Sequence, residues 1–205
     1  MPGLIYLDHE STTIRLPTLS QEDNDEDKSN SIIIFGSPFS ELDESKHQNW
    51  AFQYSPEQAD EIWSAIPANT DILITHTPPA GHCDSSHHWI HGGCAALLKR
   101  ISQVRPALHI CGHCHEGRGA QVIRWSEPSF EGEVEVESVR TWEDPGAASR
   151  KQSLFDLTGS KGGIELIRGS ETAVINASIM GKSWKREGKE RGKVFNKPIV
   201  VDVYL

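Results

Sequence analysis

Residues 107–116 read ALHICGHCHE, and this stretch decides the fold because an apolar run leads directly into two histidines. Ala107 to Cys111 has the length and apolar content of a buried strand, which Gly112 ends. Residues 71–76, DILITH, repeat the arrangement, with an apolar run that also ends at a histidine. Two such strands with a helical segment between them predict a parallel sheet with polar groups at the carboxyl ends of its strands.

The neighbouring segments supply helices and further strands. Ser55, Pro56 and Gln58 have the pattern of a helix start, and apolar residues then recur at helical spacing until Pro67. A second amphipathic pattern begins at Cys94 and ends before Pro106. Further strands are expected over residues 4–7, 12–16, 31–35, 172–176 and 198–205. This alternation predicts an α/β, layered α+β fold.

Two segments differ in composition from the rest of a predicted single domain spanning residues 1–205. Residues 19–30 contain the acidic run QEDNDEDK, which predicts a solvated, flexible loop. Residues 126–170 are rich in Glu, Ser, Gly and Lys, and they are expected to form an insertion with little regular structure. Alternation over residues 133–139 leaves room for one strand inside it.

The composition excludes several functional classes. The 205 residues include 20 Lys and Arg against 29 Asp and Glu, for a net charge of −9. An acidic chain has no general attraction for nucleic acid or anionic lipid, so neither is an expected partner. The sequence has no apolar run long enough to span a membrane and no signal-peptide pattern, which predicts a cytoplasmic protein with reduced thiols.

The histidines are concentrated in one region. Eight of the ten lie between His76 and His115, and all four cysteines lie there too. His76, His113 and His115 follow the ends of two predicted strands, and the flexible Gly112 would let the backbone bend so that neighbouring imidazoles share a pocket. We therefore expect these three histidines to ligate a metal, against the alternative that they are ordinary loop histidines.

A structural zinc site is a rival interpretation. Cys111 and Cys114 have C-x-x-C spacing around His113, and Cys83 and Cys94 are not far along the chain. Against it, Cys111 completes an apolar strand and Cys94 lies on the apolar stripe of a helix, where cysteine often serves as a small hydrophobic residue.

The remaining histidines of the region are weaker candidates. Four lie in one loop, and His82 is favoured among them because it follows Pro-Pro-Ala-Gly; the others are His87, His88 and His91. His109 alternates with apolar residues inside a strand and is expected to be structural.

The histidine motifs resemble a known family. Thr75–Pro79 (THTPP) and Gly112–Glu116 (GHCHE) are similar to the last two metal motifs of calcineurin-like metallophosphoesterases. The small branch of metallophosphoesterase-domain proteins is the closer match, because four more short motifs follow its order. These are Tyr6-Leu7, Gly36-Ser37-Pro38, Gly93-Cys94 and Ile175–Ser178.

This resemblance implies a function. It implies hydrolysis of phosphomonoesters or phosphodiesters by a metal-activated hydroxide, on a sandwich of mixed β-sheets flanked by helices. By the same resemblance His76 and His113 would ligate one metal and His115 a second, the metals being Mn, Fe or Zn. The substrate would be a small phosphate ester. Residues that could contact it or support the ligands are Thr77, His82, Gly112 and Asn176.

The chain also departs from the family pattern. The family's Asp-x-His, Gly-Asp and Gly-Asn-His motifs are absent, so no catalytic residue is identified and the chain resembles only the C-terminal portion of the family. We therefore expect reduced or lost activity, one metal or none, and self-association through exposed sheet edges. A catalytically inactive module for protein interactions is the alternative that these absences leave open.

Overall fold

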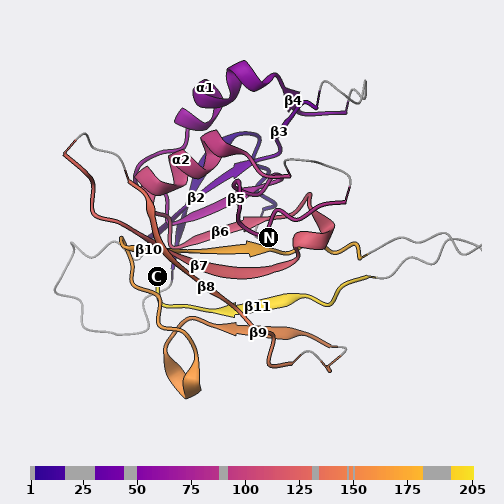
Figure 1. Cartoon of the computed structure of the whole chain (residues 1–205), viewed down its shortest axis with the longest axis vertical. Coiled ribbons are helices and arrows are strands. Elements are labelled where there is room, and N and C mark those ends of the chain that lie inside the picture. The colour runs from indigo at the N-terminus through magenta and orange to yellow at the C-terminus, as the bar shows by residue number, and fades with distance from the viewer. Residues whose placement is uncertain are drawn as a thin grey trace, which may run out of the picture.

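The computed structural model describes residues 3–16, 31–43, 50–87, 92–130, 134–146, 148–149, 151–181 and 195–205. The predicted acidic loop 19–30 lies outside the described residues. A seven-stranded mixed sheet forms the centre of the fold (Figure 1). In spatial order its strands are β1 (Glu10–Arg15), β2 (Ser31–Ser37), β5 (Ile72–Thr75), β6 (Leu108–Cys111), β10 (Glu171–Asn176), β7 (Gly119–Trp125) and β8 (Val136–Thr141).

The strands at the middle of the sheet are parallel. β2 pairs with β5, β5 with β6 and β6 with β10 in parallel, whereas β1, β7 and β8 are added antiparallel at the two sides. The parallel strands are those that the apolar runs predicted, and their carboxyl ends meet at one edge of the sheet. The predicted α/β fold with mixed sheets is therefore confirmed.

Helices cover one face of this sheet. The 3-10 turn η2 (Pro56–Gln58) leads into α1 (Ala59–Ser64), and α2 (Ala95–Val104) lies beside it (Figure 1). Both predicted helix starts are confirmed: the Gln58 side chain accepts a hydrogen bond from the Ser55 amide at 3.1 Å, and the Cys94 thiol accepts one from Leu97 at 3.4 Å. Cys94 is thus the N-cap of α2, just outside the helix. The short parallel pair β3 (Ser40–Glu41) and β4 (Gln53–Tyr54) also lies on this side of the molecule (Figure 1).

A second layer of strands covers the opposite face. β9 (Ser153–Asp156) pairs in parallel with β11 (Ile199–Asp202), and η4 (Ser160–Gly162) follows β9. Two apolar clusters result, one on each face of the central sheet. The helix side includes Phe35, Trp63, Ile66, Leu73, Leu97, Ile101, Ile123 and Val174, and the other side includes Leu108, Val122, Phe155, Leu157, Ala173 and Ile175.

Two expectations from the sequence are wrong. Residues 4–7 are not a strand; Leu4, Ile5 and Tyr6 are exposed, because no described strand lies beside them to pair with. Residues 126–170 have more regular structure than expected: β8 overlaps the strand for which the alternation over 133–139 left room, whereas β9 and η4 were not expected. The short alternating segment SLFD buries Phe155 against the sheet, a signal that the polar average of the insertion conceals.

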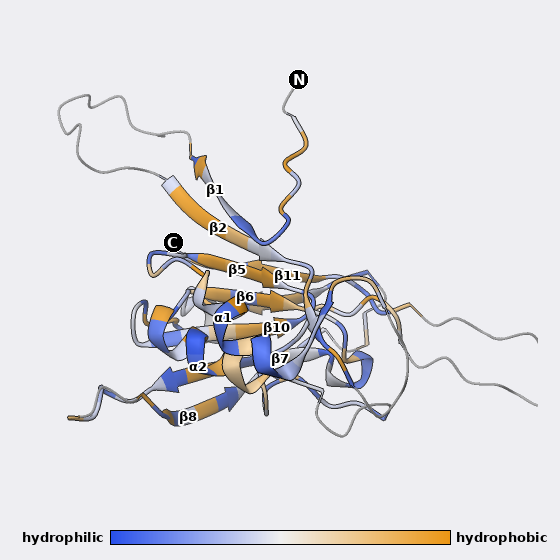
Figure 2. Cartoon of the chain, turned by 90° about the horizontal axis from the view of Figure 1, so that it is seen from above, coloured by the Kyte–Doolittle hydropathy of each residue, from blue (hydrophilic) through white to orange (hydrophobic). Residues whose placement is uncertain are grey.

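The edge of the central sheet that β1 and β2 form is less covered than its middle. β1 and β2 extend beyond the remaining strands, and apolar residues of this pair remain partly exposed (Figure 2). Within the described residues, no helix is both long enough and apolar enough to cross a membrane.

Candidate metal centre

The candidate site forms where the parallel strands end. Hydrogen bonds between the backbones continue past the strands: the His76 amide donates to Ser37 at 3.1 Å, and the Gly112 amide donates to His76 at 3.1 Å. The Ala177 amide likewise donates to Cys111 at 2.8 Å. The segments that follow β2, β5, β6 and β10 are therefore held in register with one another, and this fixes the backbone from which the histidines project.

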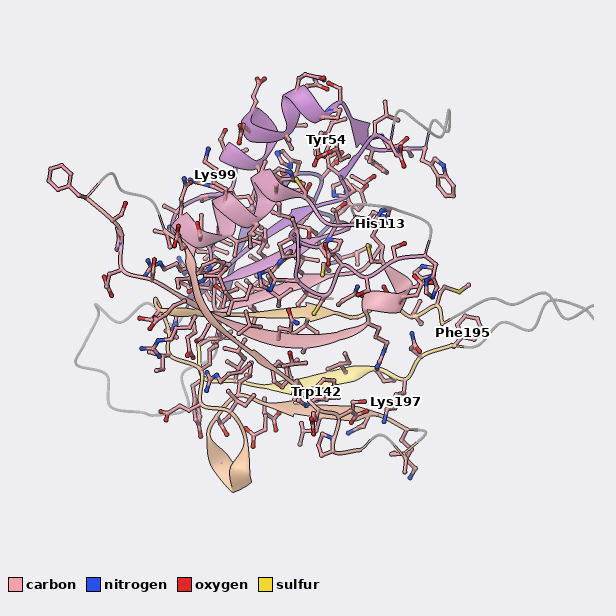
Figure 3. The ribbon with its side chains drawn as sticks, in the orientation of Figure 1. Tyr54, Lys99, His113, Trp142, Phe195 and Lys197 are labelled. Carbon is pink, nitrogen blue, oxygen red and sulfur yellow. The ribbon has the colours of Figure 1, made fainter. Side chains whose placement is uncertain are left out.

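His76 and His113 form the centre of the site. Nε2 of His76 and Nδ1 of His113 lie 3.0 Å apart, with ring centroids 4.8 Å apart. One of these nitrogens donates a hydrogen bond to the other in the arrangement seen. His113 projects from the edge where β6 and β10 end (Figure 3). The sequence prediction that these two imidazoles converge is met in the geometry, although metal binding itself stays a prediction.

The bend that brings His113 into place is not at the glycine. His113 itself has φ +60°, in the left-handed region, whereas Gly112 does not have a positive φ. A Cβ at Gly112 would have Ser178 Oγ at 3.8 Å and the His76 carbonyl oxygen at 3.9 Å, which are ordinary contacts. The expectation that Gly112 supplies the flexibility is therefore wrong: the histidine takes the strained conformation, as such residues often do at functional sites.

His115 lies near the pair without joining it. It begins the 3-10 turn η3 (His115–Gly117) and is exposed. The pKa of His76 lies below its ordinary value, first because neighbouring atoms desolvate the ring and second because a charge on His115 would repel one on His76. Desolvation lowers this pKa even though His76 reaches solvent at the surface. His76 is thus neutral at pH 7, the form of imidazole that binds metals.

The donor set fits a single ion only in part. Two neutral imidazoles with nitrogens 3.0 Å apart can occupy neighbouring positions around one ion of the Zn, Mn or Fe type. Across the described segments, no three or more His, Cys, Asp or Glu side chains are grouped so that they could hold a metal. His115 as a third ligand stays a prediction, and the described residues bring no carboxylates to the pair that could offset the charge of a dinuclear centre.

Thr77 holds the turn that carries His76. It is buried, and its hydroxyl donates to the Phe39 carbonyl at 3.2 Å. Thr75, one residue before His76, donates to the Thr77 carbonyl at 2.5 Å. Thr77 thus supports the ligand from beneath, and its hydroxyl is engaged away from any substrate.

His82 also lies beneath the surface. It is buried, and its Nδ1 is 3.1 Å from the amide oxygen of Gln121 on β7, so this nitrogen is the donor. This contact gives His82 a structural partner on the sheet. Of the other loop histidines, His87 is exposed, and His88 and His91 lie outside the described residues.

Asn176, at the end of β10, touches both histidine-bearing loops. Its Nδ2 donates to the Cys83 carbonyl at 2.8 Å and to the Cys114 carbonyl at 2.7 Å. Its Oδ1 accepts from the Ser178 amide at 3.0 Å and from the Ser178 hydroxyl at 2.7 Å. Asn176 is fully buried, so it supports the loops and does not present its amide to a substrate.

The cysteines are arranged as core residues. Cys111 belongs to the helix-side apolar cluster, whereas the Cys114 thiol donates to the Gly92 carbonyl at 3.2 Å. Burial raises the pKa of Cys83 to about 11 and that of Cys114 to about 12, which keeps both as neutral thiols. Among the described residues, these thiols form no group of three or more His, Cys, Asp or Glu side chains that could hold a metal, so the arrangement does not favour the structural zinc alternative.

Sequence reasoning missed the place of His9. Its Nε2 donates to the Ile62 carbonyl at 3.1 Å, so Nδ1 accepts from the Ser37 hydroxyl at 3.0 Å. The ring packs edge-on against Phe35 and fastens the N-terminal segment behind the end of β2. The backbone of His9 itself is left-handed, with φ +58°, and this conformation directs its ring to the contact. No periodic pattern in the sequence signals such a contact.

Curated relatives share part of this chain. A UPF0046 protein of Caenorhabditis elegans is 44% identical over 90 residues, which are 43% of this chain and 22% of that protein. The human metallophosphoesterase domain-containing protein 1 is 40% identical over 93 residues, 42% of this chain and 26% of that protein. A probable rhamnogalacturonate lyase C of Emericella nidulans is 35% identical over 144 residues, 68% of this chain but 12% of that protein.

The chain therefore spans about a quarter of the length of the first two of these relatives, and about an eighth of the third. No family model matches it. The name of the human relative, at 40% identity, nevertheless agrees with the family that the histidine motifs resemble. Over part of its length, the chain is related to a metallophosphoesterase-like family.

Proposed function

We propose that this chain is a metal-dependent phosphoesterase domain, which binds one divalent ion through His76 and His113 and acts weakly on phosphate esters. The observation that carries the proposal is the 3.0 Å separation of their ring nitrogens at the ends of adjacent parallel strands. Such strand ends are where open α/β sheets place ligand sites. The kinship with metallophosphoesterase-domain proteins supports the reaction class.

The side chains have separate tasks in this proposal. His76 and His113 hold the ion, and a bound divalent ion supplies Lewis-acid polarisation of a phosphoryl oxygen together with a water of lowered pKa. His115 is exposed and acts electrostatically on His76, which supports a role for it in meeting the same ion or the ester. Thr75, Thr77 and Asn176 keep the two loops in place from beneath.

Weak turnover follows from the charge of the site. Two imidazoles leave both charges of a divalent ion uncompensated, and the described residues place no acidic group that completes a metal cluster with them. A second ion close to the first would add repulsion with no bridging carboxylate to offset it. We therefore expect one ion per chain and hydrolysis far below that of a two-metal phosphoesterase.

Metal content tests the binding step. The purified chain is loaded with Zn²⁺ or Mn²⁺, freed of excess ion, and measured by elemental mass spectrometry. We expect about one ion in the wild type and its loss in the double variant His76→Ala/His113→Ala. His87→Ala is the matched control, because His87 is an exposed histidine of the same region without a place in the pair. Equal metal content in all three proteins would overturn the proposal.

A turnover measurement distinguishes the proposed phosphoesterase from a catalytically inactive interaction module. Within the part of the chain that the structure describes, no acidic side chain completes a metal-binding group with the pair, and this favours a catalytically inactive interaction module. On a chromogenic phosphodiester, the metal-loaded wild type should exceed the His76→Ala/His113→Ala variant if the chain is an enzyme. Equal background rates with metal bound in the wild type alone would support the inactive module.

A further inference from the structure

We propose that Asn176 is a positioning residue whose carboxamide sets the spacing between His76 and His113. This inference rests on the proposed metal site and concerns the support of that site. It starts from one geometric fact: the two N–H bonds of a single amide go to two different loops. One is to Cys83, in the loop that follows His76, and the other is to Cys114, between His113 and His115.

The donor bonds make Asn176 a crosslink between the loops. The Cys83 and Cys114 carbonyl oxygens lie 2.8 and 2.7 Å from the same nitrogen, so neither loop can shift without losing a bond. Cys114 is the residue between the two histidines of GHCH, so its peptide group determines how His113 and His115 diverge. Its thiol is held as well, by the Gly92 carbonyl.

The acceptor side fixes the orientation of the amide. Oδ1 accepts from both the amide and the hydroxyl of Ser178, at 3.0 and 2.7 Å. If the amide were flipped, its NH2 group would face the Ser178 N–H and its oxygen would face two carbonyl oxygens. Only the orientation seen lets the side chain make all of these hydrogen bonds. All four hydrogen-bonding positions of this buried side chain are thereby used.

Asn176 belongs to the central sheet, so the two histidine loops are supported from a strand. It is the last residue of β10 and pairs in register with Cys111, the last residue of β6. The side chain therefore projects from a rigid strand between the loops after β5 and β6. Groups that hydrogen-bond a ligating side chain directly commonly contribute 10- to 100-fold in metal affinity, and we take the same range for Asn176, which acts through the backbones of the two loops.

The test compares Asn176→Ala with a matched amide. Asn196→Ala removes a side chain whose Nδ2 donates to the Ser178 carbonyl at 2.9 Å, next to Asn176 but with neither histidine loop as partner. Co²⁺ is titrated into each protein and followed by its d–d absorption. We expect roughly a 10- to 100-fold weaker Co²⁺ affinity in Asn176→Ala and a change of less than about threefold in Asn196→Ala.

A metal-free measurement separates this inference from the proposed function. In the wild type, nuclear Overhauser effects between the rings of His76 and His113 report their contact, and we expect Asn176→Ala to lose them and Asn196→Ala to keep them. If the wild type binds no Co²⁺ but this difference is seen, the metal site fails and the positioning role stands. Retained ring contacts and unchanged Co²⁺ affinity in a folded Asn176→Ala protein would overturn it.

Should Asn176→Ala fail to fold, Ser178→Ala keeps the proposal testable. It removes only the hydroxyl that binds Oδ1 and leaves the Ser178 amide in place. We expect a smaller loss of Co²⁺ affinity, about three- to tenfold, with weakened ring contacts. A Ser178→Ala protein identical to the wild type in both measurements would contradict the role of Asn176 in orienting the loops.

Discussion

The hydroxyl of Thr75 lies 2.7 Å from Nε2 of His109, inside the sheet and directly beneath the turn that carries His76. Because Thr75 donates its proton to the Thr77 carbonyl, it must accept from His109, so Nε2 of His109 carries the hydrogen. The other ring nitrogen, Nδ1, is buried without a hydrogen-bond partner among the described residues. His109 is thus an uncharged buried imidazole that supports one histidine loop of the site.

This burial predicts a loss of stability in acid. Desolvation lowers the pKa of His109 to about 3 from an ordinary value of 6.5. The unfolded chain therefore takes up a proton as the pH falls below 6.5, while the folded chain resists it down to about 3. The contribution is fully present above pH 6.5 and diminishes as the pH falls from there toward 3.

Urea unfolding at pH 7 and pH 5 measures this effect. His109→Leu should lose less stability between the two pH values than the wild type, because it removes the group that the unfolded chain protonates. The exposed His87→Ala should follow the wild type. An unchanged pH slope in His109→Leu would mean that the imidazole is already charged in the folded protein.

Arg140 provides a second prediction, on the insertion. It lies 2.8 Å from the carboxylate of Glu171, which is 2% exposed, and Arg124 lies 3.4 Å from the same carboxylate. Arg140→Met leaves the buried carboxylate with the Ile167 amide at 3.0 Å and, as its only charged partner among the described residues, Arg124 at 3.4 Å, and we expect a loss of about 2 kcal/mol in the free energy of unfolding. The arginine is itself nearly half exposed, which keeps the figure below that of a fully buried pair.

Glu137→Gln is the matched control for this ion pair. Glu137 contacts Arg124 at 3.2 Å, but both side chains are largely exposed, and such pairs contribute about 0–1 kcal/mol. Equal losses in the two variants, measured by chemical denaturation, would show that the burial of Glu171 does not matter.

The central strands could be predicted from the sequence because they are both apolar and short. DILIT and ALHIC become β5 and β6 with their histidines at the predicted ends. The strand over 172–176 becomes β10 for the same reason. In a parallel sheet buried on both faces, local apolar content and burial coincide, so a local pattern is sufficient.

The supporting contacts could not be predicted because they are made over long separations. Asn176 reaches residues 93 and 62 positions away, and His9 reaches one 53 positions away. These contacts are hydrogen bonds of individual side chains, which leave no periodic pattern in a sequence. The left-handed conformation of His113 is of the same kind, since the neighbouring glycine was the more probable residue to adopt it.

The edge of the sheet predicts self-association. β1 has β2 on one side and no strand of the described residues on the other, and Ile14 and Leu16 are 39% and 45% exposed. An unprotected edge strand beside apolar surface is a template for pairing between chains. Light scattering coupled to size exclusion should show mass that rises with protein concentration.

Thr13→Pro should reduce this association. Proline removes an N–H and disfavours further pairing at an edge strand. Val139→Pro on β8, at the opposite edge, is the control that distinguishes pairing at β1 from non-specific association. The prediction fails if the wild type remains a monomer at all concentrations tested, or if the two variants behave alike.

The two glycines on either side of His113 and His115 should differ in their tolerance of alanine. A Cβ at Gly117 would lie 2.1 Å from the Cys83 carbonyl oxygen, so either η3 or the loop after β5 would have to move. Forced overpacking of this kind commonly costs about 1–3 kcal/mol in the free energy of unfolding. At Gly112 the nearest atom to a Cβ is 3.8 Å away, and alanine there should be neutral or slightly stabilising. Thermal melts and Co²⁺ titrations of both variants test this prediction. Gly112→Ala should keep the wild-type melting temperature and Co²⁺ affinity. Gly117→Ala should lower both, because it displaces the Cys83 carbonyl, to which Asn176 donates.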